Sequence, residues 1–247
     1  MIPIKTDSAW RGTADCRNCG IRDMVLFADL KEEDFSLIHA PIDDLEFNAG
    51  DSLQRMGDQA ASLMTLRVGM VKLVRNMADG RQRIVRVLRP GDVLGLEALF
   101  SSTYECEAVA LTPVKVCRLP VEVIHRLNTE TPRLHQRLMG KWHKSLKEAD
   151  DWLADLNFGN ARQRLAGLVL KMRAHVLAGS PLPGTSLESG VVTLFSREDM
   201  GAMLDLKLET VSRTLSAFVR EGLLEPLDRQ GRAYRVLDEA RLASPKD

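Results

Sequence analysis

The sequence predicts an α+β protein with a β-rich N-terminal domain, a long central helix and a C-terminal domain of short helices and a hairpin. Three observations predict this order. Turn-forming residues recur at short intervals between positions 42 and about 120, with apolar or alternating runs between them. Apolar residues then recur every three or four positions from 132 to 156. Finally, two short amphipathic stretches follow one another between 195 and 224.

The first part of the chain divides into a segment with little periodicity, residues 1–25, and a stretch at 26–41 whose apolar residues predict a short helix. Beyond it, turns rich in Gly and Asp separate short strands. Asp79-Gly80 is the strongest hairpin signal, because this dipeptide suits the left-handed positions of a tight turn. Strands at this spacing indicate a barrel or jelly roll, followed by a short helix at 121–129.

The stretch from Pro132 to Leu156 predicts one long helix, because proline suits a first helical position and the apolar residues continue at steps of three or four. This spacing is close to a heptad, so we expect a dimerising coiled coil. A helix that packs inside one subunit is the alternative. The predicted dimer seam consists of Leu138, Trp142, Leu146, Ala149 and Leu153.

The stretch from Phe195 to Leu224 predicts a helix-turn-helix. Ser196 suits the N-cap of the first helix, because its hydroxyl can accept from an otherwise unpaired amide, and Asp199 lies three residues on. A turn at Asp205–Lys207 leads into the second helix, which Gly222 ends. The residues expected to point inward are Met200, Met203, Leu204, Leu206, Leu208, Val211, Leu215 and Phe218.

The opposite face of the second predicted helix carries groups that can read base edges. Arg213 can donate two hydrogen bonds to guanine, Glu209 can accept from the cytosine amino group, and Ser212 can bond a base edge or a phosphate. The second helix of such a pair enters the DNA major groove, so we predict that these residues read bases. A solvated face on a structural helix pair is the alternative.

A helix at 161–177 and a short strand at 191–194 precede the helix pair, and the stretch 227–236 follows it as a hairpin with Gly231 at its tip. These elements predict a winged helix-turn-helix. Polar and cationic side chains here can meet phosphates, which positions a protein on DNA without specifying sequence. The predicted backbone-contacting residues are Ser196, Arg197, Lys207, Arg229 and Arg232.

The composition is that of a globular protein, with 45% hydrophobic residues, 28% charged residues and a formal net charge of +0 over 247 residues. No apolar run is long enough to span a membrane, and the N-terminus lacks the apolar core of a signal peptide, so we expect a cytoplasmic protein with no membrane partner. Zero net charge argues against a nonspecific polycation. It permits a sequence-specific DNA binder, which needs only a local basic surface.

The second helix also resembles a known family. Its stretch LETVSRTLSAFVREGLL is similar to the recognition helix of the CRP/FNR superfamily of bacterial transcriptional regulators, and the E-x-x-S-R arrangement is that of the FNR branch. In the cyclic-AMP receptor branch, an arginine and a glycine stand where this chain has Leu208 and Ser212. The resemblance covers nearly the whole chain. It implies a cyclic-nucleotide-binding-type β-roll, a TTGAT-type half-site, a homodimer on double-stranded DNA and RNA polymerase as a partner.

The resemblance also bears on the dimer seam. FNR-type regulators dimerise only when their iron–sulfur cluster is assembled, and they are expected to carry an acidic residue at the position that matches Ala149. A charge in the seam weakens the dimer, so that a bound ligand can shift the equilibrium between monomer and dimer. Because alanine carries no charge, we expect this chain to be dimeric without any cofactor.

The four cysteines match the FNR branch in part and do not suggest a disulfide framework. Val25 stands where a third N-terminal thiolate belongs, and it cannot ligate iron. Cys106 is a further candidate ligand. There are two alternatives to a [4Fe–4S] cluster. One is a thiol or disulfide switch at the C-x-x-C pair. The other is that the cysteines are remnants, with Cys106 and Cys117 simply buried as small hydrophobic residues. The cluster ligands that the resemblance implies, with one unusual oxygen donor, are Cys16, Cys19, Cys117 and Asp23.

The predicted roll lacks the phosphate-binding groups of a cyclic-nucleotide site. Such a site needs a glutamate for the ribose hydroxyl and an arginine, paired with a small hydroxyl residue, for the phosphate. Glu97 lies near the first position, but Tyr104 and Glu105 fall where the pair belongs. Glu105 and Glu107 would repel a phosphate, so we expect no cyclic nucleotide.

These observations predict a dimeric transcriptional regulator that reads a TTGAT-type palindrome and senses an oxygen- or redox-related signal. The alternative is a signalling or regulatory subunit that has the cyclic-nucleotide-binding fold but does not read DNA. An enzyme is not expected, because no catalytic motif stands out. The predicted domains are an N-terminal cysteine-containing segment (1–25), a sensory β-roll (26–130), a dimerisation helix (131–157) and a winged helix-turn-helix domain (158–247).

Overall fold

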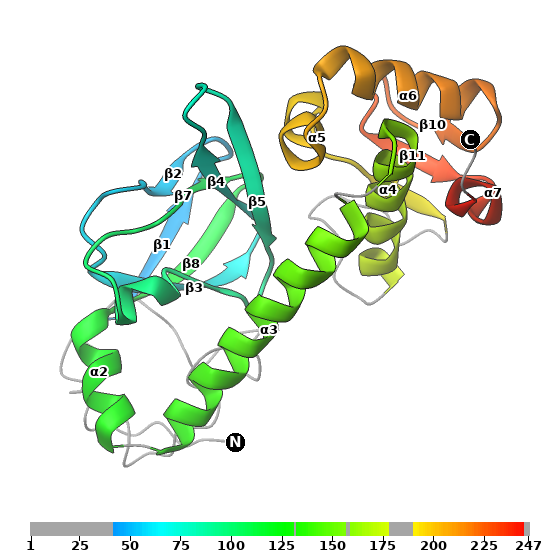
Figure 1. The fold of residues 1–247 in the computed structure, drawn as a ribbon. Coiled ribbons are helices and arrows are strands. Elements are labelled where there is room, and N and C mark those ends of the chain that lie inside the picture. Colours follow the sequence, from blue (N-terminus) through cyan, green and yellow to red (C-terminus); the bar gives the residue numbers. More distant parts are fainter. Residues whose placement is uncertain (1–41, 131, 157–158, 178–189, 245–247) are drawn as a thin grey trace. The chain divides into compact units, whose positions relative to one another are not determined.

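The computed structural model describes residues 42–130, 132–156, 159–177 and 190–244 (Figure 1). Contacts within it divide the chain into two units, Met1–Arg75 with Val85–Lys147 and Asn76–Ile84 with Glu148–Asp247. Each unit is described by itself. The predicted cysteine-containing segment at 1–25 and the helix at 26–41 lie outside the described residues, so the predicted domain boundaries stay a prediction.

The N-terminal unit contains a roll of two four-stranded sheets, ordered β1-β8-β3-β6 and β2-β7-β4-β5, which confirms the predicted jelly-roll type of fold. Gly80 has a φ of 83° in the turn between β4 and β5, so the predicted hairpin is also confirmed. The elements are β1 (Asp43–Phe47), β2 (Ser52–Gln54), β3 (Ser62–Val68), β4 (Val71–Asn76), β5 (Gln82–Leu88), β6 (Val93–Leu94), the 3₁₀ helix η2 (Leu96–Leu99), β7 (Glu107–Ala110), β8 (Val114–Pro120) and the helix α2 (Val121–Glu130).

Two clusters of buried side chains form the core of the roll. One lies between the sheets and includes Leu66, Val71 and Val116. The other extends from the β1-β8-β3-β6 sheet onto the helices and includes Ile124 of α2 and Leu138. Burial of such side chains is the main force that holds a small domain together, at roughly 25 cal/mol per Å² of apolar surface.

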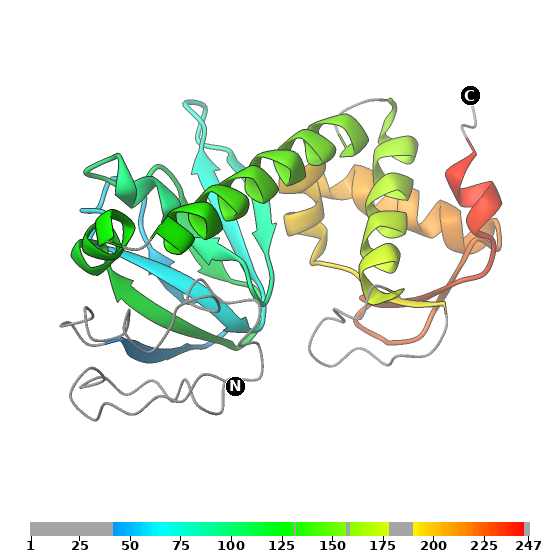
Figure 2. The ribbon, with the colours of Figure 1, turned by 90° about the horizontal axis from the view of Figure 1, so that it is seen from below.

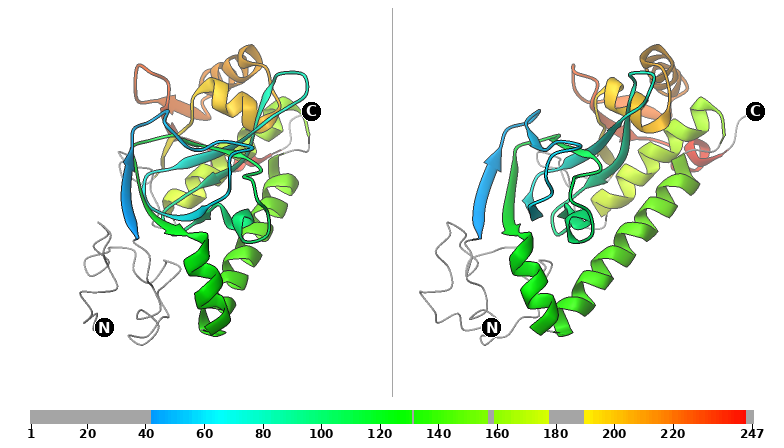
Figure 3. Two further views of the ribbon diagram at one scale, coloured as in Figure 1. Left: turned by 90° about the vertical axis from the view of Figure 1, so that its left-hand side faces the viewer. Right: turned by 60° about the vertical axis from the view of Figure 1, so that its left-hand side comes forward.

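The helix α3 (Pro132–Leu156) has 25 residues and runs without a break, as the long green helix of Figure 3 shows. It matches the predicted bounds. Its N-terminal half is fixed to the roll at the turn before β6. The Lys141 ammonium group donates to the carbonyl oxygen of Gly91, and Lys144 Nζ lies 2.7 Å from Asp92 Oδ1.

The C-terminal unit has the elements of a winged helix. Its sheet has the order β10-β11-β9, and α4 packs against β9, α5, α6 and α7 (Figure 2). The elements are α4 (Ala161–Leu177), β9 (Val191–Thr193), α5 (Arg197–Leu204), α6 (Leu208–Arg220), β10 (Leu224–Pro226), β11 (Ala233–Val236) and α7 (Glu239–Ala243). None of the described helices is long and apolar enough to cross a membrane.

The residues predicted to point inward in the helix pair are buried, except that Leu206 is half-buried and Leu208 is exposed. Met200 and Leu204 of α5 and Val211 and Phe218 of α6 are fully buried. Leu208 was expected to begin the stripe of α6, but 46% of it is exposed. It has the right spacing, yet as the first residue of α6 it lies beyond the part of the helix that the core covers.

Candidate nucleic-acid interface

The start of α5 is fixed by a side-chain cap. Ser196 Oγ accepts from the backbone amide of Asp199 at 3.0 Å and donates to Asp199 Oδ2 at 2.7 Å. This satisfies an amide that the first helical turn leaves without a partner, and it confirms the predicted N-cap. At the other end of α5, Asp205 adopts a left-handed conformation with φ 54° and its amide donates to the carbonyl oxygen of Gly201.

The turn between α5 and α6 depends on a glycine that sequence reasoning missed. A Cβ atom placed on Gly201 would lie 2.6 Å from the carbonyl oxygen of Leu206, closer than real side chains approach. The absence of a side chain therefore lets the chain turn back tightly over α5. The available signal was a glycine inside an otherwise helical pattern, which marks a close approach of backbone.

The two faces of α6 differ sharply. Val211, Leu215 and Phe218 are buried, whereas Glu209 and Arg213 are exposed and Ser212 is half-buried. Glu209, Ser212 and Arg213 stand at positions i, i+3 and i+4, which places them on one side of the helix. The structure therefore brings the predicted base-reading residues together on the face of α6 that points away from the core of its unit.

Arginines of α4 hold α5 and α6 in place. Arg162 donates to both carboxylate oxygens of Glu221, at 3.0 and 2.6 Å, and its guanidinium carbon lies 4.8 Å from the centre of the Phe218 ring. Arg164 Nη1 donates to the carbonyl oxygen of Leu204, the last residue of α5, at 2.7 Å. Two-point arginine contacts of this kind restrict orientation as well as adding stability.

Two of the predicted phosphate-contacting residues are instead used inside the domain. Arg197 donates to the carbonyl oxygen of Gly231 at 2.6 Å and to the hydroxyl of Tyr234 at 3.0 Å, which ties the start of α5 to the wing. The hydroxyl of Ser196 forms the cap described above. The polar groups of both residues therefore position the helix. The other predicted backbone contacts, Lys207, Arg229 and Arg232, are exposed.

The predicted wing is confirmed as a hairpin of β10 and β11, in which Leu224 pairs with Val236. Gly231 has a φ of 64° at its tip. Asp228 braces the loop, because its carboxylate accepts from the amides of Arg232 at 2.9 Å and Ala233 at 3.0 Å. Burial alone would raise the pKa of Asp228, but these amide bonds and the charge of Arg232 hold that pKa below its usual value.

The exposed apolar residues of α3 differ from the predicted seam at one position. Leu138 is only 2% exposed and lies in the core of the roll, so it has no surface to offer a partner. Met139, which the sequence reasoning missed, is 42% exposed, and Leu146 and Leu153 are 57% and 58% exposed. Leu138 lies four residues before Trp142 and Met139 lies three before it, and both spacings place a residue on the same helix face as Trp142. Only packing against the roll decides that Leu138 is buried and Met139 is exposed.

With this correction the exposed stripe of α3 follows a heptad. The steps from residue to residue are three, four, three and four, the alternation that keeps a stripe facing a second helix. Trp142 is 37% exposed within it, and Ala149 is half-buried. The corrected stripe consists of Met139, Trp142, Leu146, Ala149 and Leu153.

The positions that a cyclic nucleotide would use are occupied by contacts within the roll. Glu97 accepts from Gln54 Nε2 at 3.4 Å. Tyr104 is 6% exposed, and its hydroxyl donates to the carbonyl oxygen of Ser62 at 2.8 Å. Glu105 is exposed and carries the wrong charge for a phosphate. Tyr104 is therefore a core residue that fastens the loop before β7 to β3.

The predicted cluster ligands lie largely outside the described residues. Cys16, Cys19 and Asp23 fall there, whereas Cys117 is a described residue of β8 and is 8% exposed. Within the described ranges, no group of three or more His, Cys, Asp or Glu side chains could hold a metal ion. Burial, then the charge of Glu97, raises the pKa of the Cys106 thiol, so this thiol is a weak nucleophile.

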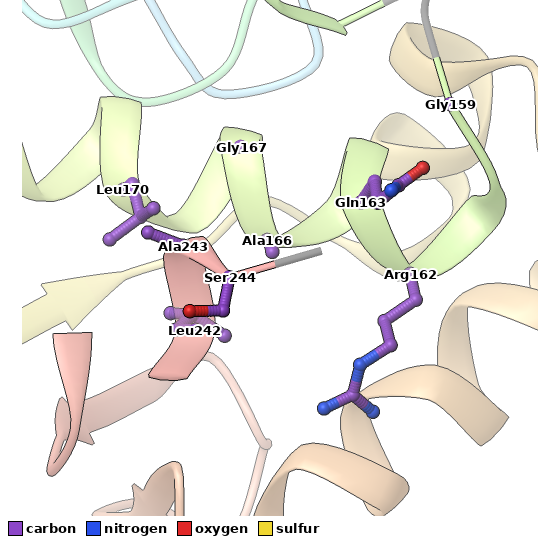
Figure 4. A pocket seen from close by; sticks show the side chains of 9 residues that line it. All are labelled: Gly159, Arg162, Gln163, Ala166, Gly167, Leu170, Leu242, Ala243 and Ser244. Atoms are coloured by element: carbon purple, nitrogen blue, oxygen red, sulfur yellow. The ribbon is translucent and has the colours of Figure 1, made fainter. Parts of the chain in front are cut away.

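A pocket of about 400 Å³ lies between α4 and α7 of the C-terminal unit (Figure 4). Ala166 and Leu170 of α4 face Ala243, the last residue of α7, and Ser244, which follows it, across the pocket. Arg162 also borders the pocket, but its guanidinium group is engaged with Glu221. No residue of the exposed α6 face lines it, so we assign it no part in base reading.

Comparisons with known proteins agree with this arrangement. Residues 44–130 match the family model of the cyclic nucleotide-binding domain, and residues 163–244 match that of the Crp-like helix-turn-helix domain. The transcriptional activator protein anr of Pseudomonas aeruginosa is 26% identical over 232 residues, which cover 94% of this chain and 92% of that protein. The fumarate and nitrate reduction regulatory protein of Salmonella typhi is 28% identical over 210 residues, covering 85% of this chain and 82% of that protein.

Solved structures show the same fold. FixK2 from Bradyrhizobium japonicum is similar with a TM-score of 0.69 at 24% identity, over 82% of this chain and 96% of that one. A CRP-family transcriptional regulator from Thermus thermophilus is similar with a TM-score of 0.68 at 26% identity, over 80% of this chain and 94% of that one.

The fold, the two domain matches and these relatives define a DNA-binding transcriptional regulator whose N-terminal roll has the cyclic-nucleotide-binding fold. The chain belongs to the CRP/FNR superfamily and is FNR-like.

Proposed function

We propose that this regulator acts as a homodimer and reads a TTGAT-type palindrome through Glu209, Ser212 and Arg213. The observation that carries the proposal is the free face of α6, where these residues lie opposite the buried stripe. Arg213 bonds guanine and Glu209 bonds cytosine, while Lys207, Arg229 and Arg232 contact phosphates. Bound at such a site, the dimer acts on transcription through RNA polymerase.

The dimer follows from α3. A stripe of apolar side chains at heptad spacing pairs best with a second helix of the same kind. Two copies related by a two-fold axis present two recognition helices to half-sites about 34 Å apart, one turn of the duplex. Because Ala149 leaves the seam uncharged, the dimer forms without a cofactor. Sedimentation of the cofactor-free protein tests this, and a mainly monomeric species at micromolar concentration would refute it.

A binding titration with labelled duplexes tests base reading. Arg213→Ala should weaken binding to a TTGAT palindrome by about 1–3 kcal/mol for each half-site, and should lose the preference over a duplex with the G·C pair replaced. Arg220→Ala is the matched control, because Arg220 is an exposed arginine in the last turn of the same helix. It should weaken binding to both duplexes alike. An unchanged preference in Arg213→Ala would overturn the assignment.

The proposed signal is oxygen or another oxidant, sensed through the cysteines. Cys117 is buried in the roll, in the same cluster as Ile42, which is the first residue that the structure describes. The proposed ligands of a [4Fe–4S] cluster are Cys16, Cys19, Cys117 and Asp23, and the cluster would supply the oxygen-sensitive group.

Iron and sulfide analysis of anaerobically purified protein tests the cluster. The parent protein should contain both and absorb in the visible range, and Cys117→Ser should lose most of the iron. Cys106→Ser removes the other thiol of the roll, the further candidate ligand, and it should keep the iron because the proposed fourth ligand is Asp23. A parent protein without iron under these conditions excludes the cluster and leaves the DNA-binding proposal intact.

A cyclic nucleotide is not the proposed signal, because Tyr104 and Glu105 replace the phosphate-binding pair. Titration calorimetry with cyclic AMP and cyclic GMP should show no heat of binding at millimolar ligand. Saturable binding of either nucleotide would overturn this part of the proposal.

A further inference from the structure

Phe100 is an unusually exposed aromatic residue of the roll. It follows η2 directly as its C-cap and is 75% exposed, the highest value among the exposed large hydrophobic residues of the described ranges. A phenylalanine exposed to this degree leaves a large apolar area in water, which favours association with another apolar surface.

The ring of Phe100 is not isolated, because it packs against the exposed stripe of α3. Its centroid lies 5.0 Å from that of Trp142, with the ring planes at 62°, an edge-to-face arrangement. Trp142 in turn lies between Met139 and Leu146 in the heptad. The roll and the helix thus form one continuous apolar surface, consisting of Phe100, Met139, Trp142 and Leu146, which we call the aromatic patch.

Polar contacts hold the two halves of the aromatic patch in register. Lys141 and Lys144 attach α3 to Gly91 and Asp92, in the turn that leads through β6 to η2. Leu138, one residue before Met139, is locked into the core of the roll. The ring of Phe100 therefore keeps its place beside the stripe, and a partner that covers the stripe next to Trp142 also meets Phe100.

We infer that Phe100 is part of the subunit interface and that, together with Trp142, it packs against a second copy of this chain. The occupant follows from the spacing of the stripe and from the contact that joins Phe100 to it. The stripe beside Phe100 has the heptad period that selects a like helix, and the patch is continuous with that stripe through the contact between Phe100 and Trp142. The inference rests on the proposed homodimer and extends its interface from α3 onto the roll.

A dilution series followed by sedimentation velocity measures the effect. Phe100→Ala should raise the dimer dissociation constant by about tenfold or more, as expected for an aromatic anchor in an interface. Phe100→Tyr, which keeps the ring, should restore most of the affinity. Val68→Ala is the matched control, because Val68 is another exposed apolar residue of the roll, at 45% exposure. The Ser62 end of β3 lies beside Gly95, just before η2, and Val68 lies at the opposite end of that strand. This variant should leave the dissociation constant unchanged.

A charged seam variant separates failure of the inference from failure of the proposed dimer. If Leu146→Glu remains dimeric, the proposal that the α3 stripe forms the dimer interface is wrong. If Leu146→Glu is monomeric but Phe100→Ala dissociates like the parent, only the role of Phe100 is wrong. In the monomeric Leu146→Glu background, Phe100→Ala should lower the melting temperature only slightly, because it removes one edge-to-face contact with Trp142. A marked drop there would assign the ring to the stability of its own subunit and overturn the inference.

Discussion

The helices α3 and α6 have the same design but expose opposite chemistry. Leu138 of α3 is buried in the core of the roll, and Val211 and Phe218 of α6 are buried in the core of the winged helix. On the free side, α3 exposes apolar side chains such as Leu146, whereas α6 exposes the charges of Glu209 and Arg213. An exposed apolar stripe suits a protein partner and an exposed polar face suits base edges. The difference indicates which helix meets which partner.

A charge placed on α3 tests its half of this comparison and should have the largest effect. Leu146→Glu puts a carboxylate into the apolar seam, so we expect the dimer dissociation constant to rise about 100-fold or more, equivalent to about 3 kcal/mol. Binding to a palindromic duplex should fall with it. Analytical ultracentrifugation measures the first and a duplex titration the second.

Gly140→Glu is the control for this variant. It adds the same charge to α3 at an exposed position where a new Cβ atom meets nothing within 4 Å. Its dissociation constant should stay near that of the parent. Equal dissociation of both variants would show that charge anywhere on α3, rather than in the seam, breaks the dimer.

A side chain in the turn before α6 tests whether the recognition face depends on backbone packing. Gly201→Ala drives a methyl group against the carbonyl oxygen of Leu206, so we expect the C-terminal unit to lose about 2–3 kcal/mol of stability. Denaturant unfolding of the full chain measures this, with specific DNA binding as a second readout. Stability equal to the parent would mean that the turn relaxes without loss.

The arginines of the winged helix should separate into scaffold and contact residues. Arg197→Ala removes the bonds to Gly231 and Tyr234, so the unfolding free energy should fall by about 1–2 kcal/mol. Arg229→Ala should leave stability unchanged, weaken binding to all DNA sequences alike and lower the salt dependence by about one counterion. If the two variants show the same pattern in both assays, the division is wrong.

A second glycine substitution should have the smallest effect and the opposite sign. Gly140 lies on an exposed face in the middle of α3. Gly140→Ala should therefore stabilise the protein by about 0.5–1 kcal/mol, because alanine has less backbone freedom to lose from the unfolded chain. Thermal unfolding measures the gain. Destabilisation here would indicate that the exposed face at Gly140 is closely packed in the assembled protein.

Features that depend on neighbouring residues could be predicted from the sequence. The Ser196 cap needs only Asp199, three residues away, and the turn at Gly80 needs only its own dipeptide. The buried stripe of α6 follows from helical periodicity. The base-reading residues then follow as the side opposite that stripe, although their contacts with DNA stay a prediction.

Features that depend on distant parts of the chain could not be predicted. Leu138 and Met139 are adjacent apolar residues that both continue an acceptable helical spacing, and the roll decides which is buried. Arg197 looked like a phosphate contact because its partners, Gly231 and Tyr234, are 34 and 37 residues away. The predicted ligands near the N-terminus lie outside the described residues and remain predictions.

The arginines of α4 have a consequence for how a signal can act. Arg162 bonds Glu221 at the end of α6, and Arg164 bonds the carbonyl oxygen of Leu204 at the end of α5. The recognition face therefore cannot rotate relative to α4 without breaking these arginine hydrogen bonds. A signal that alters DNA binding would therefore have to move α4, α5 and α6 together.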